Sequence, residues 1–235
     1  SPILSFFDGI TDATIKIVDI AIKVAPYGVF ALLSSVVSSF GTDILFALLK
    51  YALITIMGMV IMIFVYPGLV YLFTRKNPGP FIKHVRGPQM IAFSTSSSSA
   101  ALPVTIETCE QKLGVSPNIA SFVLPLGTTV NMDGTALYQG VSAVFIAQVY
   151  GMSLGLGAQL TIVLTAILAS IGTAGAPGAV MIMLVLVLKQ VGIPTEGIAL
   201  ILGVERILDM FRTTVNVTGN ASAAMIIDHS EKENI

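Results

Sequence analysis

Hydrophobic residues form long runs along this chain, and polar or small residues interrupt the runs at a few places. About twenty consecutive apolar residues cross a bilayer as a helix. The run from Leu45 to Phe73 has that length and carries no charge after Lys50. An earlier run, from Ile15 to Phe40, is interrupted by Pro26 and carries three charges in its first half. We therefore predict two long helices, of which the second is the clearer membrane span and the first begins at an interface or against protein.

The later runs are shorter, and their interruptions follow a pattern. Apolar residues 89–93 and 100–106 flank the polar stretch Ser94–Ser99, and residues 160–169 and 179–188 flank Ser170–Gly178. Each set predicts a helix, a tip of small or polar residues, and a helix back, because neither arm is long enough to span. Between the two hairpins, polar residues beginning at Gly127 divide an apolar stretch, which predicts one broken spanning helix. Residues 198–227 predict a long last helix with polar positions inside it.

The order of these elements repeats, since each hairpin is followed by a helix with buried polar groups. Short, interrupted apolar segments at corresponding positions of two halves are typical of a transporter's binding site. Lipid cannot hydrogen-bond free backbone groups, so non-helical backbone at membrane depth must line a protein or water cavity. We therefore predict an all-α membrane protein, multi-span and helical, with two re-entrant helical hairpins and a broken helix, as in inverted-repeat secondary transporters.

Composition supports a lipid environment and removes other classes of function. Hydrophobic residues make up 54% of the 235 residues and charged residues 11%, against about 25% in soluble domains. Net charge is −1, which gives nucleic-acid binding no electrostatic basis. The basic residues between Arg75 and Arg86 predict a cytoplasmic loop. An intramembrane serine protease would need a base near its serine, and the two histidines, His84 and His229, both lie in charged border segments. We therefore expect no enzyme.

Polar residues on the last helix recur at spacings of three or four. At 100° per residue they lie within a sector of about 100°, so this stripe should face the protein interior. Ionisable residues inside a membrane are costly and indicate function by default. A guanidinium suits a carboxylate, and a carboxylate one turn earlier suits an ammonium, so Arg212 and Asp209 fit a zwitterion with a second carboxylate. The alternative is that these two residues simply pair with each other. The stripe comprises Glu205, Asp209, Arg212, Thr213, Asn216 and Asn220.

Asp133 is the only charged residue between Lys112 and Lys189, and it lies in the interruption of the broken helix. A lone buried carboxylate needs a cation or a proton. Oxygen-rich surroundings favour a hard cation, and sodium is the obvious one for a transporter. The alternative is a protonated, structural aspartate bonded to hydroxyl groups.

Four motifs in this order resemble those of the dicarboxylate/amino acid:cation symporters, which include prokaryotic glutamate/aspartate transporters and the related neuronal excitatory amino-acid transporters. The motifs are Ser96–Ser99, Asn131–Tyr138, Gly172–Gly178 and Asp209–Gly219. The resemblance covers the chain from its first residues and corresponds to the fifth of eight family helices onward. It implies a scaffold-type helix over 1–42 and a transport domain over 43–235. That domain would contain a spanning helix 43–74, a re-entrant hairpin 81–114, a broken helix 117–151, a second re-entrant hairpin 156–193 and a last helix 195–228.

The resemblance also implies roles for individual residues. The inner gate would carry Ser97 and Ser98, and the outer gate Ala176 and Gly178. Arg212 would clamp the substrate's side-chain carboxylate and Asp209 its amino group. Further substrate contacts would be Thr135, Thr213 and Asn216. Implied sodium ligands form three sets, which are Gly127, Asn131, Asn216 and Asn220; Thr129, Met132, Ser170, Ile171 and Thr173; and Asn131 with Asp133.

The function implied is secondary active symport of L-glutamate or L-aspartate with Na⁺ and/or H⁺ by alternating access. The full-length protein would be a multi-pass homotrimer in the cell (cytoplasmic) membrane, and transport by this part alone is not expected. Asn220 stands where sodium-driven relatives carry Asp, which opens proton coupling, and Gln139 stands where neuronal relatives carry the Glu linked to potassium counter-transport. Glu205 and Arg206 are expected to form a supporting pair. Alternatives are proton-coupled C4-dicarboxylate symport and a cation or anion channel.

Overall fold

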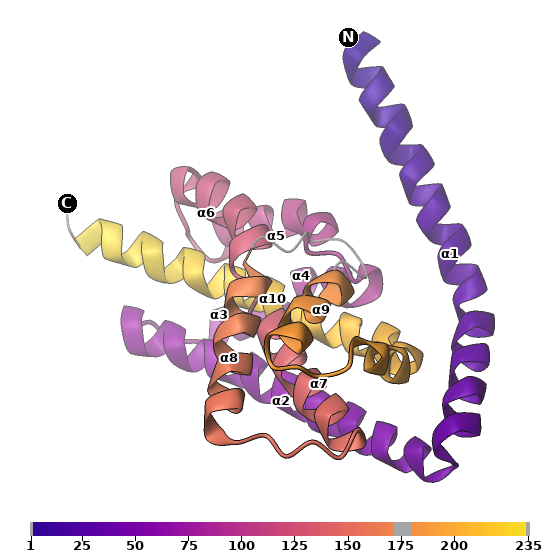
Figure 1. The fold of residues 1–235 in the computed structure, drawn as a ribbon. Coiled ribbons are helices and arrows are strands. Elements are labelled where there is room, and N and C mark those ends of the chain that lie inside the picture. The colour runs from indigo at the N-terminus through magenta and orange to yellow at the C-terminus, as the bar shows by residue number, and fades with distance from the viewer. Residues whose placement is uncertain (1, 172–179, 234–235) are drawn as a thin grey trace.

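The computed structural model describes residues 2–171 and 180–233, and every element in that part of the chain is a helix (Figure 1). The first two helices are long, α1 (Pro2–Phe40) and α2 (Asp43–Thr74). Gly41 joins them with φ +80°, a conformation that glycine adopts without a steric penalty. In Figure 1 the first half of α1 extends away from the other helices, and α1 meets the bundle near its junction with α2.

Within the described residues, α2 is the one helix that is both long enough and apolar enough to cross a membrane. Tyr51, Met59, Tyr66 and Val70 lie on its buried side, where α2 packs mainly against α10. Its other side exposes large apolar residues, among them Phe64. A helix that is apolar all round suits a position between protein and lipid.

Three helices follow, α3 (Gly79–His84), α4 (Arg86–Thr95) and α5 (Ser98–Lys112), and the last two form a helix-turn-helix pair. Ser96 takes a left-handed conformation at the turn, with φ 51°. Ser97 then caps α5, because its Oγ accepts a hydrogen bond from the backbone N–H of Ala100 at 3.2 Å. This pair of helices packs along α10, where the Gln89 amide donates to Thr218 Oγ1 at 3.0 Å.

The next stretch forms α6 (Pro117–Val130) and α7 (Asp133–Val149), separated by Asn131 and Met132. Both residues have non-helical backbone angles, with ψ near 78° and 53°. A helix end leaves carbonyl groups without intrahelical partners, and a helix start leaves N–H groups without them. The break therefore places free backbone acceptors and donors side by side in the middle of the bundle.

The last part contains α8 (Leu156–Ser170), α9 (Val180–Gln190), the short 3₁₀ helix η1 (Thr195–Gly197) and α10 (Ile198–Glu233). α10 contacts α1, α2, η1 and each of α4 to α7. Residues 212–222 are all buried, so the predicted inward-facing polar stripe is confirmed. The predicted tip at 172–178 lies outside the described residues.

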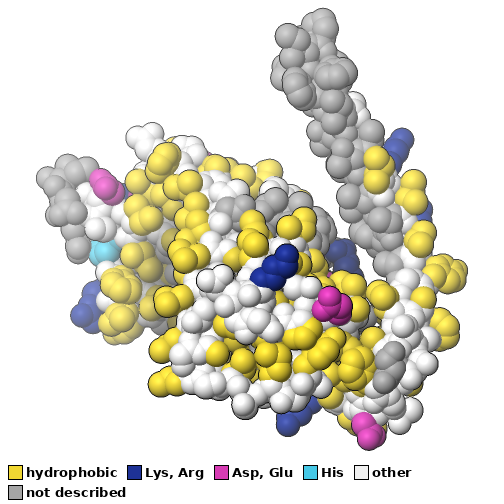
Figure 2. All heavy atoms as spheres, in the orientation of Figure 1, with side chains coloured by type: hydrophobic (Ala, Val, Ile, Leu, Met, Phe, Trp, Pro, Cys, Tyr) yellow, Lys and Arg dark blue, Asp and Glu magenta, His cyan; other side chains and the backbone are white. Residues whose placement is uncertain are grey.

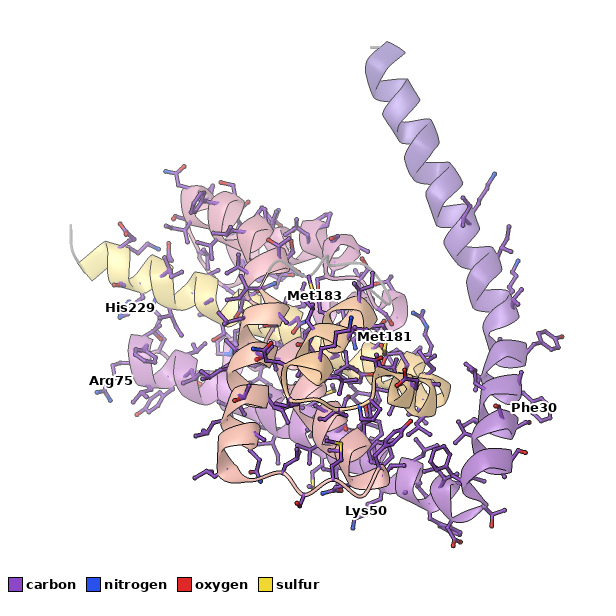
Figure 3. All side chains as sticks on the ribbon, in the orientation of Figure 1. Phe30, Lys50, Arg75, Met181, Met183 and His229 are labelled. Atoms are coloured by element: carbon purple, nitrogen blue, oxygen red, sulfur yellow. The ribbon has the colours of Figure 1, made fainter. Side chains whose placement is uncertain are left out.

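Apolar side chains cover much of the surface seen in Figure 2, and charged groups are sparse there. On α1, Phe30 is 74% exposed and points away from the bundle (Figure 3). Figure 3 places Arg75 and His229 at one end of the bundle, where α2 and α10 terminate. An all-helical chain with this surface is consistent with a helical membrane transporter. The re-entry of both hairpins into the membrane and the inverted repeat stay predictions.

Candidate functional site

Asn216 on α10 spans the break between α6 and α7. Its Oδ1 accepts a 2.8 Å hydrogen bond from the backbone N–H of Gly134, one of the free donors at the start of α7. Its Nδ2 lies 3.1 Å from Met132 Sδ and 3.3 Å from Thr135 Oγ1. A Cβ on Gly134 would lie 2.6 Å from the carbonyl oxygen of Arg212, so only glycine permits this approach of α7 to α10.

Asn131 lies between Asp133 and Asn220. When the Asn131 amide is oriented so that its nitrogen donates to Asp133, that nitrogen is 3.0 Å from Oδ1 and 3.2 Å from Oδ2 of Asp133. The amide oxygen then faces the side chain and the backbone N–H of Asn220, at 3.0 and 3.2 Å. These contacts bring together three of the residues that the sequence predicts as cation ligands.

Tyr66 on α2 completes this cluster, because its hydroxyl donates to Asp133 Oδ2 at 2.8 Å. Gly219 permits the approach, since a Cβ there would lie 3.0 Å from both Asp133 Oδ2 and the Tyr66 hydroxyl. A Cβ on Gly127 would lie 2.6 Å from Asn220 Oδ1. A carboxylate, two amides and nearby backbone carbonyls form a donor set that suits a hard monovalent or divalent cation rather than a soft metal.

A second cluster surrounds Arg212, which is buried. Its Nη2 lies 2.6 Å from Asp209 Oδ1, and its Nη1 lies 3.1 Å from Glu205 Oε1. Its guanidinium also lies over the ring of Tyr138 on α7, 4.8 Å from the centroid. Thr213 Oγ1 donates to Asp209 Oδ1 at 3.3 Å. The guanidinium is therefore held in place by two carboxylates and a ring.

The expected pair of Glu205 with Arg206 is wrong, since Glu205 pairs with Arg212 instead. Adjacent helical residues point about 100° apart, whereas residues seven apart lie on the same face two turns away. Arg212 and Asp209 do pair with each other, as the alternative interpretation of the sequence predicts. Both belong to α10, so this ion pair joins no two helices.

The remaining predicted residues lie at the hairpin tips and near the break. Ser98 is buried at the start of α5, and Ser97 is half-buried at its cap. Thr129 is exposed, and its hydroxyl donates to the Leu126 carbonyl within α6. Ser170 is buried at the end of α8, and its hydroxyl donates to Ile167, while Ile171 is exposed. Three predicted residues, Thr173, Ala176 and Gly178, lie outside the described residues.

Three residues of these clusters, Tyr66, Tyr138 and Gly219, were not predicted as site residues from the sequence. A tyrosine inside an otherwise apolar span is a signal that could have identified Tyr66, because a buried hydroxyl needs a partner. Tyr138 was noted only as part of a motif, and its contact with Arg212 follows from tertiary packing.

Comparison with known proteins assigns the family. Residues 1–230 match the model of the sodium:dicarboxylate symporter family. The chain is 41% identical over 230 residues to the proton/sodium-glutamate symport protein of Bacillus subtilis (strain 168), covering 98% of this chain and 53% of that protein. It is 41% identical over 233 residues to the human excitatory amino acid transporter 1, covering 98% of this chain and 43% of that protein. The chain thus spans about half the length of the curated relatives it matches. It belongs to the sodium:dicarboxylate symporter family, a family of membrane transporters.

Proposed function

We propose that the full-length protein imports acidic amino acids, L-glutamate or L-aspartate, by secondary active symport with Na⁺ and/or H⁺. The observation that carries this proposal is the buried Arg212 with Asp209 beside it, about one turn before Asn216, whose side chain binds the start of α7. A buried guanidinium favours a ligand carboxylate, and a buried carboxylate next to it favours a ligand ammonium. Relatives at 41% identity that are named glutamate symporters and excitatory amino acid transporters support the same substrate class.

The substrate would lie between α10 and the start of α7. Its side-chain carboxylate would bind Arg212 in place of one of the two carboxylates that hold the guanidinium in the structure. Its ammonium group would bind Asp209. Thr213 and Asn216, one turn apart on α10, and Thr135 on α7 would supply polar contacts. The hairpin residues Ser97 and Ser98, together with Ala176 and Gly178, would close over the substrate from its two sides.

The coupled cations would bind at the break. Asp133 supplies the charge, and Asn131, Asn216, Asn220 and the carbonyl of Gly127 supply neutral oxygens. A second set, nearer the second hairpin, would use Thr129, Met132, Ser170, Ile171 and Thr173. Asn216 belongs to both the cation cluster and the substrate cluster. Occupancy of one site would therefore favour the other, which is the energetic coupling that a symporter requires.

These sites would move as one body during alternating access. In this proposal residues 43–235 form the transport domain with its two re-entrant hairpins, and residues 1–42 belong to a scaffold. The full-length protein would be a multi-pass homotrimer of the cytoplasmic membrane. The position of α1, which contacts the bundle over only part of its length, is compatible with this division (Figure 1).

The test uses the full-length protein in vesicles, with radiolabelled L-glutamate and L-aspartate and an imposed inward sodium or proton gradient. We expect accumulation above the external concentration, which a channel cannot produce. Arg212→Ala should abolish this uptake, whereas Arg86→Ala, at the exposed start of α4, should leave it unchanged. Unchanged uptake by Arg212→Ala would refute the clamp. Uptake of succinate but of neither amino acid would replace the proposal with dicarboxylate symport.

A further inference from the structure

Glu205 is a buried carboxylate that the proposed substrate and cation sites do not use. Its Oε1 lies 3.1 Å from Arg212 Nη1, and its Oε2 has no hydrogen-bond partner within the described residues. Tyr138 has a buried hydroxyl that is likewise without a partner there. The Tyr138 hydroxyl and the Glu205 carboxylate are close enough to interact, yet the hydroxyl and Glu205 Oε2 form no hydrogen bond in the structure. Buried polar atoms without partners are rare and call for an explanation.

Charge is also unbalanced around Arg212. Two buried carboxylates, Glu205 and Asp209, share one guanidinium, which leaves one negative charge in excess. The titratable groups that face Glu205 are Arg212 and Asp209 from α10, Tyr138 from α7 and Tyr51 from α2. The facing part of α1, around Leu33, carries no charged residue, since none occurs between Lys23 and Asp43. Among the described residues, Arg212 is the cation that pairs with Glu205.

The carboxylates of the two clusters, of which Glu205 and Asp209 are buried and Asp133 is half-buried, differ in the hydrogen bonds that they accept. Asp209 accepts a 2.6 Å bond from Arg212 and a second bond from Thr213. Asp133 accepts from Tyr66 and faces the Asn131 amide. Hydrogen bonds to a carboxylate favour its ionised form. Glu205 accepts only the 3.1 Å bond from Arg212 and its Oε2 accepts none, so it is the least hydrogen-bonded of these carboxylates.

Substrate binding would remove even that bond. A substrate carboxylate that takes Glu205's place on Arg212 leaves Glu205 buried and unpaired, and an isolated buried carboxylate neutralises rather than remains charged. We propose that Glu205 takes up one proton when the substrate binds and is the site that couples proton movement to transport. This inference rests on the proposed function and names its proton-binding residue.

The step is a simple protonation. A hydronium ion in the open site gives its proton to Glu205 Oε2, where an O–H bond forms, and a water molecule leaves. The protonated Glu205 can then donate a hydrogen bond to the Tyr138 hydroxyl, so both unsatisfied groups gain a partner. When the substrate leaves on the other side of the membrane, the proton returns to water and Glu205 rebinds Arg212. One proton thus crosses with each substrate.

The decisive experiment measures protons and substrate together. The full-length protein is reconstituted in weakly buffered vesicles with a pH indicator outside, and L-glutamate or L-aspartate is added. We expect about one proton taken up per substrate by the wild type, and about zero by Glu205→Gln, because a single linked group binds a single proton. Glu205→Asp keeps a carboxylate and should keep proton coupling. Glu231→Gln, on the exposed end of the same helix, should match the wild type.

An infrared difference spectrum of the wild type provides a readout that does not depend on how the variants fold. Substrate binding should produce the carbonyl band of a newly protonated carboxyl group, and Glu205→Gln should lack that band. Wild-type uptake of acidic amino acids without proton movement, without the band, or with equal proton movement in Glu205→Gln would overturn the inference. Failure of the wild type to import any acidic amino acid would instead overturn the proposed function.

Discussion

The hydroxyl of Tyr66 donates a 2.8 Å hydrogen bond to Asp133 Oδ2, and this bond connects the C-terminal half of α2 to the break between α6 and α7. Tyr66 belongs to the helix with the clearest membrane-spanning pattern, and Asp133 is the carboxylate of the proposed cation site. The bond fixes the orientation of the carboxylate that the proposed site would use to bind a cation. The oxygen that accepts this bond also lies against Gly219, so α2, α7 and α10 meet at one point.

Loss of this bond should destabilise the protein. A hydrogen bond to a charged group contributes about 1.5–3 kcal/mol, so we expect Tyr66→Phe to lower the free energy of unfolding by that amount. Denaturant unfolding of the full-length protein in detergent measures the change. Tyr71→Phe is the matched control, because Tyr71 on the same helix is 52% exposed and should change stability by less than about 0.5 kcal/mol. Equal losses in the two variants would contradict a specific role for the Tyr66 hydroxyl.

Gly127 should be intolerant of even a methyl group. A Cβ there would lie 2.6 Å from Asn220 Oδ1, so Gly127→Ala must displace the Asn220 side chain from the break. Overpacking of this kind costs about 1–3 kcal/mol. When the cation-bound form bears that cost in free energy, the half-saturating sodium concentration rises about tenfold. Gly140→Ala, on α7, adds the same methyl where no atom lies within 4 Å and should bind sodium as the wild type does. Sodium titration of substrate binding separates the two outcomes.

The approximate positions of the described helices, and of the interruptions at 96–97 and 131–132, could be predicted from the sequence. Polar or glycine-containing breaks in an apolar run mark places where backbone groups need hydrogen-bond partners other than lipid. The inward stripe of α10 could be predicted for the same reason. The rotation of α2 could not, since a helix that is apolar all round gives no signal of which side faces protein. The Tyr66–Asp133 bond depends on that rotation. The Glu205–Arg212 pair was accessible from spacing, because seven residues separate them along one face, but the adjacent Arg206 was assigned instead.

Asp228 should make stability depend on pH in acid. It lies in the charged end of α10, beyond the apolar part, and it accepts bonds from the backbone N–H of Ser116 at 2.8 Å and from Lys232 Nζ at 2.6 Å. Burial raises the pKa of Asp228, but the bonds from Lys232 and Ser116 outweigh that effect and hold the pKa below its ordinary value of 3.8. A depressed folded-state pKa adds stability that is complete above the unfolded pKa and is lost as pH falls through the folded pKa.

The corresponding variant is Asp228→Asn. It should be less stable than the wild type near neutral pH, and the difference should shrink as pH falls below the ordinary aspartate range, because the wild type then loses the same charge. Unfolding curves at a series of pH values measure this. Glu231→Gln, one turn away and exposed, should show a constant, small difference. A gap between wild type and Asp228→Asn that does not narrow in acid would contradict the assignment of the charge to this carboxylate.

Asn220 should determine how strongly the break binds sodium. Its buried side chain lies 3.0 Å from the Asn131 amide and next to Gly127, so Asn220→Asp would place a second carboxylate beside Asp133. A unit charge about 4 Å from a cation is worth about 4 kcal/mol at an effective dielectric of 20, and the cost of burying the new carboxylate offsets part of that gain. We therefore expect the half-saturating sodium concentration to fall about tenfold or more.

Asn118→Asp adds the same charge at an exposed position of α6 and should change the sodium titration little. A sodium titration of Asn220→Asp that matches the wild type would show that Asn220 lies outside the cation's coordination shell, and the proposed ligand set at the break would then reduce to Gly127, Asn131, Asp133 and Asn216.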